Sequence, residues 1–224
     1  MQRARLVILA GAVFYSAWII APLMGSRLDP LRSYVSEVGA AGQPHAVFFR
    51  CTDLLAGTCF VVAAALWWRA AGRPSLPGRI ALCGVLLMGA ATMCDAALPL
   101  SCTPTADPAC QARELAGQVP FTHVAHAFSS GLAGTGGAIA VLGWLAWLRR
   151  RRPDGAALPA VVTGFVFLIA TVWTVAAMAP SSLGFEAPEL YLGLAQRLQI
   201  ASITLWLVLM AVTRLPPPRR PAPS

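Results

Sequence analysis

Six apolar runs, each close to twenty residues long, constrain the fold of this chain more than any other feature. They cover residues 6–24, 48–68, 80–98, 123–148, 158–179 and 191–212. A helix of about 20 apolar residues crosses the hydrocarbon core of a bilayer. Because lipid offers the backbone no hydrogen bonds, a helix that satisfies its own is the natural structure for such runs. The pattern predicts an all-α, polytopic membrane helix bundle with six transmembrane helices.

The composition agrees with a membrane protein and excludes a soluble domain of this size. Of the 224 residues, 57% are hydrophobic and 12% are charged, which is too apolar for a soluble domain. We expect one transmembrane domain over residues 1–214 and a disordered tail, rich in proline and arginine, over 215–224. No A-x-A-like cleavage site follows the first run, so we expect an uncleaved first helix.

The basic residues predict the orientation of the chain in the membrane. All 17 are arginines. With a cytoplasmic N-terminus, twelve of them lie on the inner side and five on the outer side, in keeping with the positive-inside rule. We therefore expect both termini in the cytoplasm and the chain in the plasma membrane. The net charge of +8 then reflects topology and contact with membrane lipids rather than nucleic-acid binding. The sequence identifies no protein partner.

The cysteines agree with this orientation. Cys102 and Cys110 lie in the loop between the third and fourth runs, on the expected outer side. Disulfides form in oxidising compartments outside the cytoplasm, and turn-forming residues between these two cysteines allow the ends of the loop to meet. We expect a disulfide between them. The other four cysteines lie inside apolar runs, where they act as small apolar residues.

Ionisable side chains within the apolar runs gather near the outer end of each run. At about 1.5 Å per residue, they lie roughly 5–10 Å below the membrane surface. Charges inside a bilayer are costly, and they usually face the bundle interior, one another or a water-filled cavity. The sequence therefore predicts an outward-facing polar pocket. Its expected members are Asp53, Asp95, His123, His126 and Arg197, with Arg50 at the rim.

One interpretation of this polar layer is a metal centre. The two aspartates and two histidines offer a mixed oxygen and nitrogen ligand set that would suit zinc, and the histidines share one helix face. A metal would activate water for hydrolysis of a lipid or envelope substrate, while Arg197 holds an anionic group. Ser36 and Glu37 would complete this catalytic site, Ser36 as a partner of the water and Glu37 as general base.

The other interpretation is structural, and the sequence leaves both open. Asp53 and Asp95 would pair with Arg50 and Arg197 in a neutral clamp that locks the helices together. The protein would then have a non-catalytic envelope or scaffold role. A small-solute transporter is less favoured, because mid-membrane charges and helices broken by glycine or proline in matched halves are missing from the sequence.

The segment before the second run has the features of a short amphipathic helix. Asp29 suits the N-cap, Pro30 the first helical position and Gly39 a stop, with apolar residues at helical spacing between them. A helix with one apolar stripe suits the membrane interface. His45, further along the segment, is expected to be an exposed loop residue.

A resemblance to a known family rests on five short stretches of the chain. These are 29–39, 49–57, 94–99, 123–126 and 193–197. With these stretches the chain resembles, over nearly its whole length, the bacterial membrane family called domain of unknown function 998. That resemblance implies a bundle of six or seven helices and assigns no activity. More distantly, the order serine, aspartate, aspartate and paired histidines is similar to the membrane metallohydrolases that include alkaline ceramidases, which implies a metal hydrolase.

Overall fold

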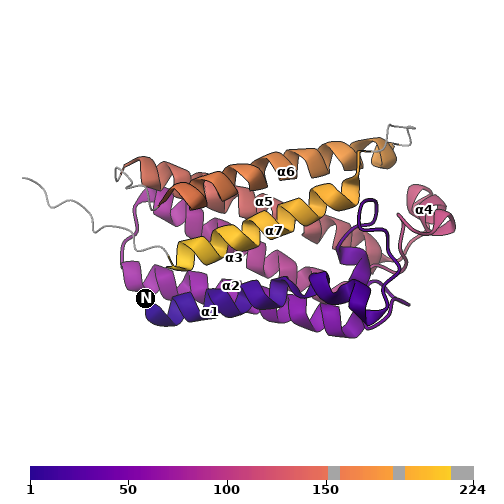
Figure 1. Ribbon diagram of the computed structural model, residues 1–224, viewed down its shortest axis with the longest axis horizontal. Helices are drawn as coiled ribbons and strands as arrows, with labels where there is room; N and C mark the ends of the chain where they lie inside the picture. Colours follow the sequence, from indigo (N-terminus) through magenta and orange to yellow (C-terminus); the bar gives the residue numbers. More distant parts are fainter. Residues whose placement is uncertain (151–156, 184–189, 213–224) are drawn as a thin grey trace, which may run out of the picture.

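The structure, a computed structural model, describes residues 1–150, 157–183 and 190–212, and these form helices joined by turns and loops (Figure 1). Six helices are long and apolar enough to cross a membrane, so the predicted fold class is confirmed. The predicted tail at 215–224 lies outside the described residues. The six spans are Gln2–Met24, Ala46–Ala71, Leu76–Ala97, Phe121–Arg149, Leu158–Ala179 and Leu192–Val212.

Local chemistry explains where several of these elements begin and end. The first span consists of α1 (Gln2–Tyr15) and a 3-10 helix, η1 (Ala17–Met24), which meet at Ser16. Helix α2 (Ala46–Ala71) stops at Gly72, whose φ of 61° is left-handed and favours glycine. The short helix α4 (Pro108–Leu115) begins at Asp107, whose carboxylate accepts a hydrogen bond from the Ala109 amide at 2.9 Å.

The spans form a closed ring in which each packs against the next. Its order is α1, α2, α3 (Leu76–Ala97), α5 (Phe121–Arg149), α6 (Leu158–Leu183) and α7 (Leu192–Val212), which returns to α1. The α3–α5 pair packs most extensively and the α5–α6 pair least. Since lipid tails are as apolar as the side chains, such seams depend on close van der Waals contact, which small residues allow.

An apolar core fills the ring in its middle and toward the end away from α4. Phe60, Phe167 and Trp206 are almost completely buried there. The Trp144 and Trp206 rings meet edge to face, with centroids 5.8 Å apart, a geometry that aromatic rings favour. Among the described residues, the buried glutamate and histidines (Glu37, His123 and His126) all lie toward the end that carries α4.

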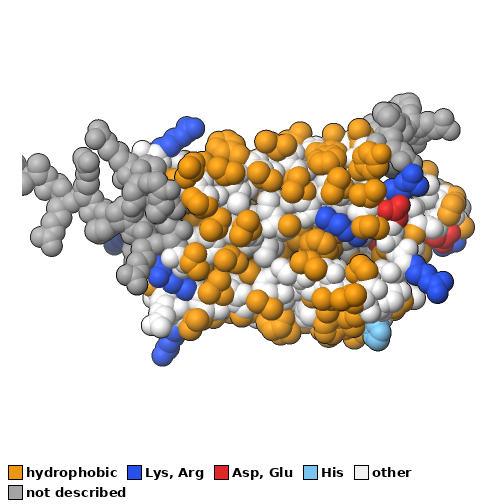
Figure 2. Space-filling view, in the orientation of Figure 1, with side chains coloured by type: hydrophobic (Ala, Val, Ile, Leu, Met, Phe, Trp, Pro, Cys, Tyr) orange, Lys and Arg blue, Asp and Glu red, His pale blue; other side chains and the backbone are white. Residues whose placement is uncertain are grey.

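The surface agrees with a protein that crosses a membrane. Figure 2 shows apolar side chains over the middle of the molecule and most of the charged ones toward its two ends. The N-terminus and the end of α7 both lie at the end opposite α4 (Figure 1). Both described ends of the chain are thus on one side, as six crossings require.

The segment before α2 differs from its prediction, because no continuous helix forms over Asp29–Gly39. It consists of a turn after Asp29 and a short 3-10 helix, η2 (Ser36–Gly39). Only part of this backbone bonds to itself, as where the Ser33 amide donates to the Asp29 carbonyl at 2.8 Å. Other groups bond to α7, as where the Leu194 amide donates to the Leu31 carbonyl at 3.2 Å. The segment is folded over the end of the ring, where Glu37 is fully buried.

The loop between α3 and α5 is closed by the predicted cysteine pair. The sulfur atoms of Cys102 and Cys110 lie at disulfide distance, so the loop is joined to α4. The remaining cysteines (51, 59, 83 and 94) are free thiols on the helices α2 and α3. The disulfide therefore fixes the position of α4, which lies over one end of the ring.

Candidate functional site

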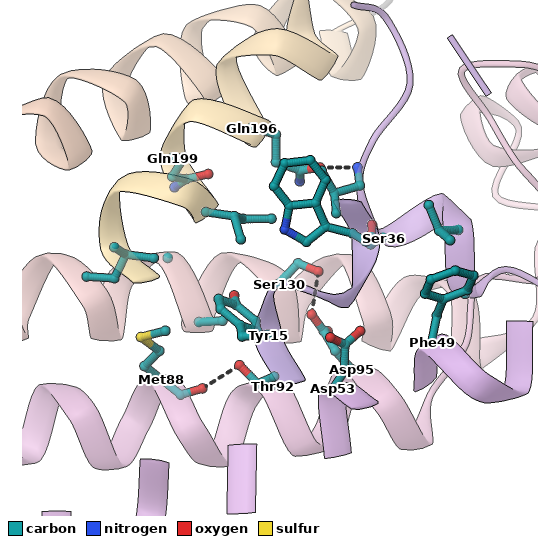
Figure 3. A pocket seen from close by; sticks show the side chains of 18 of the residues that line it. Tyr15, Ser36, Phe49, Asp53, Met88, Thr92, Asp95, Ser130, Gln196 and Gln199 are labelled. Carbon is teal, nitrogen blue, oxygen red and sulfur yellow. Dashed lines mark hydrogen bonds between the residues drawn. The ribbon is translucent and has the colours of Figure 1, made fainter. Parts of the chain in front are cut away.

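A cavity of about 100 Å³ lies inside the ring at the end that carries α4. Its polar wall brings together helices that are far apart in the sequence, with Asp53 from α2, Asp95 from α3 and Ser130 from α5. In Figure 3 the carboxylates of Asp53 and Asp95 lie next to each other, with Ser130 above them. The structure thus places two of the expected acidic residues at one site.

The two carboxylates have different surroundings. Asp95 accepts hydrogen bonds from the hydroxyl of Ser129 and from that of Ser130, the latter at 2.7 Å. Asp53 faces Asp95, and within the described ranges it forms no ion pair. Two ionised carboxylates side by side in a membrane interior repel each other and have lost much of their hydration. The pair becomes favourable when a proton, a cation or a hydrogen-bond donor joins it.

His126 lies beside Asp95 but points its Nδ1 atom at the end of α3. Nδ1 is 2.8 Å from the Leu98 carbonyl oxygen and 3.8 Å from the Asp95 carboxylate. Since a carbonyl oxygen only accepts, Nδ1 must carry the hydrogen. The residue is 6% exposed, and its Nε2 atom has no hydrogen-bond partner among the described residues. A neutral ring therefore leaves a buried acceptor at Nε2.

His123 contacts the loop after α3 and helix α4 rather than the acidic pair. Its Nδ1 atom accepts a hydrogen bond from the Ser101 amide at 3.2 Å and is 3.0 Å from the Ser101 hydroxyl. Its Nε2 atom lies 3.4 Å from a carboxylate oxygen of Glu114 in α4. Although the two histidines are three residues apart on α5, their rings have separate partners.

The expected zinc ligands do not converge in this arrangement. Within the described ranges, histidine, cysteine, aspartate and glutamate side chains form no group of three or more that could hold a metal ion. Asp53 and Asp95 share a cavity, but His123 is turned toward Ser101 and Glu114. The donor set therefore does not fit zinc, which needs about four ligands around one point.

The two arginines do not form the expected clamp either. Arg197 donates to the Ser33 carbonyl at 2.8 Å and to the Gly193 carbonyl at 3.1 Å. Its guanidinium carbon lies 5.9 Å from the centre of the Trp18 ring, a cation–π distance. In the part of the chain that the structure describes, no ion pair joins Arg50 or Arg197 to either aspartate. Arg197 instead ties the outer segment to α7.

The outer segment contributes one of its two expected residues to the cavity. Ser36 lines it, as Figure 3 shows. Glu37 instead accepts hydrogen bonds from the amide of Thr105, at 2.8 Å, and from its hydroxyl. Burial raises the pKa of Glu37, while the bonds from Thr105 oppose the rise. Glu37 therefore joins the segment before α2 to the loop after α3. His45, just before α2, is exposed, as expected.

A wider groove of about 590 Å³ lies between α5 and α6, with α7 behind it and α4 over its outer end. Its wall includes His126, Thr135 and Val175. The groove and the cavity share five lining residues, so the two spaces adjoin. These are Ser36, Ser130, Gly134, Gln196 and Gln199.

Two glutamines of α7, Gln196 and Gln199, line the cavity, although the predicted pocket did not include them. Gln196 accepts a hydrogen bond from the Val35 amide, and Gln199 donates to the Thr171 hydroxyl at 3.0 Å. Both point toward the cavity in Figure 3. Their signal in the sequence was a pair of uncharged polar residues three positions apart in an apolar run.

The six spans, packed in a ring, define the class of this protein, a multi-pass membrane protein of the helix-bundle type. The chain belongs to the family described as "Protein of unknown function (DUF998)", whose model matches residues 8–213. The family resemblance predicted from the sequence is thereby confirmed. Comparison with curated proteins and with solved structures finds no match, so the resemblance to alkaline ceramidases has no support.

Proposed function

We propose that the protein is a non-catalytic plasma-membrane protein whose outward-facing cavity binds a small cationic group, such as a primary ammonium. The observation that carries this proposal is that Asp53 and Asp95 share one cavity. Among the described residues, His126 is the one basic side chain in ion-pair range of either carboxylate. A bound ammonium would supply both the charge and the donors that the two carboxylates need.

The size of the cavity supports a small group rather than a whole metabolite. Its volume of about 100 Å³ corresponds to roughly three water molecules at about 30 Å³ each. The cavity also offers uncharged hydrogen-bonding partners. These are the hydroxyls of Ser36 and Ser130 and the side-chain amides of Gln196 and Gln199. Such a lining accommodates one ammonium or hydroxyl-bearing group together with a little water.

The outward direction of the cavity rests on the arginines. Arg3, Arg69 and Arg149 lie in the span ends opposite α4, in keeping with a cytoplasmic location of that side. The disulfide near α4 favours an oxidising compartment on the other side. Reporter domains fused after the C-terminus and inserted in the 102–110 loop test this: folding of a cytoplasm-specific reporter in the loop would contradict the orientation.

The binding experiment compares ethanolamine with ethylene glycol, which has a hydroxyl in place of the ammonium. Thermal unfolding of the detergent-purified protein should shift upward with ethanolamine and not with ethylene glycol, because a ligand of the folded state raises its stability. The shift should disappear in Asp53→Asn and Asp95→Asn. Asp29→Asn is the matched control, since it removes an acid outside the cavity and keeps the acceptor for the Leu31 amide.

Two outcomes of this experiment would overturn the proposal. One is an equal response to both compounds, which would leave the acidic pair without a role in binding. The other is an ethanolamine shift that persists in both aspartate variants. The unfolding of the ligand-free variants serves as an internal check that each one is folded.

The metal-dependent hydrolase remains a competitor with a separate test. Bound zinc would require His123 to leave Ser101 and Glu114 and turn toward the acidic pair. Metal analysis of protein purified without chelators should then find about one equivalent of zinc, lost in Asp95→Asn and His126→Ala. A small-solute transporter is opposed by the Trp144–Trp206 contact and its neighbours, which fill the described inner half of the ring.

A further inference from the structure

The groove between α5 and α6 has the size and depth of a site for one hydrocarbon chain. Its volume of about 590 Å³ falls within the range of about 300–1,000 Å³ that small-molecule sites occupy. On α5 it extends from His126 to Ala138, and twelve residues of helix rise about 18 Å. One leaflet of a bilayer has a hydrocarbon thickness of about 15 Å. The groove is therefore about as long as the hydrocarbon part of one leaflet is thick.

The groove exists because α5 presents small residues toward α6. A Cβ atom added to Gly131 would meet nothing within 4 Å, and one added to Gly134 would meet only the Gln199 amide nitrogen, at 3.3 Å. Across the groove, Val175 of α6 is 62% exposed. The two helices thus leave space along a surface that faces lipid in a membrane.

A buried acceptor lies at the outer end of the groove. His126 lines this end, and its Nδ1 hydrogen is directed at the Leu98 carbonyl. Nε2, on the other side of the ring, is buried without a hydrogen-bond partner in the described part of the chain. A donor on a bound molecule would satisfy it. This acceptor is independent of the small-residue face, and it indicates a ligand whose polar part lies near α4.

The groove also adjoins the acidic cavity. Ser130 and Gly134 line both spaces, and the Ser130 hydroxyl donates to Asp95 at 2.7 Å. A molecule with its chain in the groove can therefore place a polar group beside the two carboxylates. A partner helix fits less well, since a helix would cross the whole bilayer whereas the groove ends near its middle.

We propose that the groove binds one acyl chain of an outer-leaflet lipid and that the lipid's amine headgroup enters the cavity beside Asp95. The inference rests on the proposed function for its headgroup half, while the chain half rests on the groove alone. His126 Nε2 accepts a hydrogen bond from the headgroup region, and the chain runs down the α5–α6 seam to mid-membrane. The ligand enters sideways from the bilayer rather than from the aqueous phase.

The test uses the full chain in nanodiscs of phosphatidylethanolamine and phosphatidylglycerol. A few per cent of one lipid carries a photoreactive diazirine on an acyl chain, and cross-linked residues are mapped by mass spectrometry. Val175 lines the groove, whereas Ile169, equally apolar and 66% exposed on the same helix, does not. Cross-linking at Val175 should exceed that at Ile169 by about tenfold, the effect of a couple of methylene groups held in an apolar site.

Filling the groove should abolish this preference. Gly131→Trp places a ring in open space without a steric clash for its Cβ atom, and Ala127→Phe fills the same groove one turn closer to α4. In both variants cross-linking at Val175 should fall to the level of Ile169. Ala90→Trp, at an exposed position on α3 outside the groove, is the matched control and should leave the ratio unchanged.

The two halves of the proposal can fail separately. Equal cross-linking at Val175 and Ile169, or a ratio that survives both groove-filling variants, would overturn the chain site. A groove signal of the same strength with the phosphatidylethanolamine and phosphatidylglycerol probes would keep the chain site and overturn ammonium recognition by the acidic pair. A preference for the ethanolamine probe that Asp95→Asn removes would support both.

Discussion

The two faces of α5 use glycine in opposite ways. On the face toward α3, a Cβ atom on Gly136 would lie 2.4 Å from the Met88 amide nitrogen, and one on Gly143 would lie 2.5 Å from the Ala81 amide nitrogen. On the face toward α6, Gly131 has open space around it. The first face is the tightest seam of the ring and the second is its loosest.

A small residue in a membrane helix therefore indicates close helix packing only when a neighbouring backbone occupies the space that the residue leaves. Across the α3–α5 seam that space is taken by main-chain atoms, which permits the close packing on which membrane helices depend. Across the α5–α6 seam it remains as a groove at Gly131 and Gly134, whereas at Gly137 the Phe167 ring takes the space. The same residue type therefore supports stability on one side of α5 and a candidate binding site on the other.

The largest effect on stability should come from placing leucine at two glycines on opposite faces of α5. Gly136→Leu forces a side chain against the backbone of α3 and should destabilise the protein by at least about 3 kcal/mol, the upper end of overpacking in a rigid core. Gly131→Leu, on the same helix, should be neutral or stabilising by up to about 1 kcal/mol, because glycine is a poor helix former. Thermal unfolding in one detergent measures both.

The same measurement can contradict the difference between the two faces of α5. If Gly131→Leu lowers stability as much as Gly136→Leu does, the α5–α6 face is packed against something in the folded protein. The groove would then be closed, and the distinction between the two faces would be lost. Retention of a monodisperse elution profile should accompany the stable variant.

The second-largest effect should be the loss of stability when the disulfide that holds α4 over the end of the groove is removed. Replacing Cys102 and Cys110 with serine removes a cross-link between residues eight positions apart. For a loop of this length the chain-entropy model gives a loss of about 2–3 kcal/mol. Amide hydrogen exchange should rise in α4 and in the first turns of α5, but not along the α3–α5 seam. Equal protection with and without the disulfide would contradict this separation.

The third effect concerns Gln196, which lines both the cavity and the groove. Gln196→Leu keeps the side-chain volume but leaves the Val35 amide without its acceptor. Because Gln196 is only half-buried, we expect a loss of about 1 kcal/mol, at the low end for an unsatisfied donor. Amide exchange of the 29–39 segment should increase with it. Gln199→Leu, whose partner is the Thr171 hydroxyl rather than a backbone amide, provides the comparison.

The sequence predicted the ring's components well because each depends on a local property. Run length and apolar character define the six spans, and spacing and turn residues predicted the disulfide. The acidic pair was also predictable, since a carboxylate in an apolar run must face the interior. Asp53 and Asp95 consequently share a cavity.

What the sequence could not predict depends on helix rotation and on contacts between distant segments. His123 and His126 share a helix face, yet one ring bonds to Ser101 and the other to Leu98. The predicted helix at 29–39 failed because α7 competes for its backbone groups. The groove could not be predicted either, because the glycines of α5 look alike until their neighbours are known.

The smallest effect should be on the pH dependence of folding stability, through Glu37. This residue joins the 29–39 segment to Thr105 beside the groove. Burial raises its pKa above the ordinary value of 4.5, and the charge of Glu114 also raises it. The folded protein then retains a proton that the unfolded chain has released. Folding stability must therefore fall as pH rises from about 4.5 through the raised pKa.

Glu37→Gln keeps an acceptor and a donor for Thr105 but cannot titrate, so it should remove this part of the pH dependence. The melting temperature of wild type minus that of the variant should decrease as pH rises through the window, with wild type relatively most stable at the acidic end. Glu114→Gln, which removes a neighbouring charge and leaves the Glu37 hydrogen bonds in place, should narrow the window without abolishing it. Parallel curves for wild type and Glu37→Gln would mean that Glu37 has the same proton affinity folded and unfolded. The outer segment would then be solvated rather than packed over the ring, and the open face of α5 would have lost one wall of its groove.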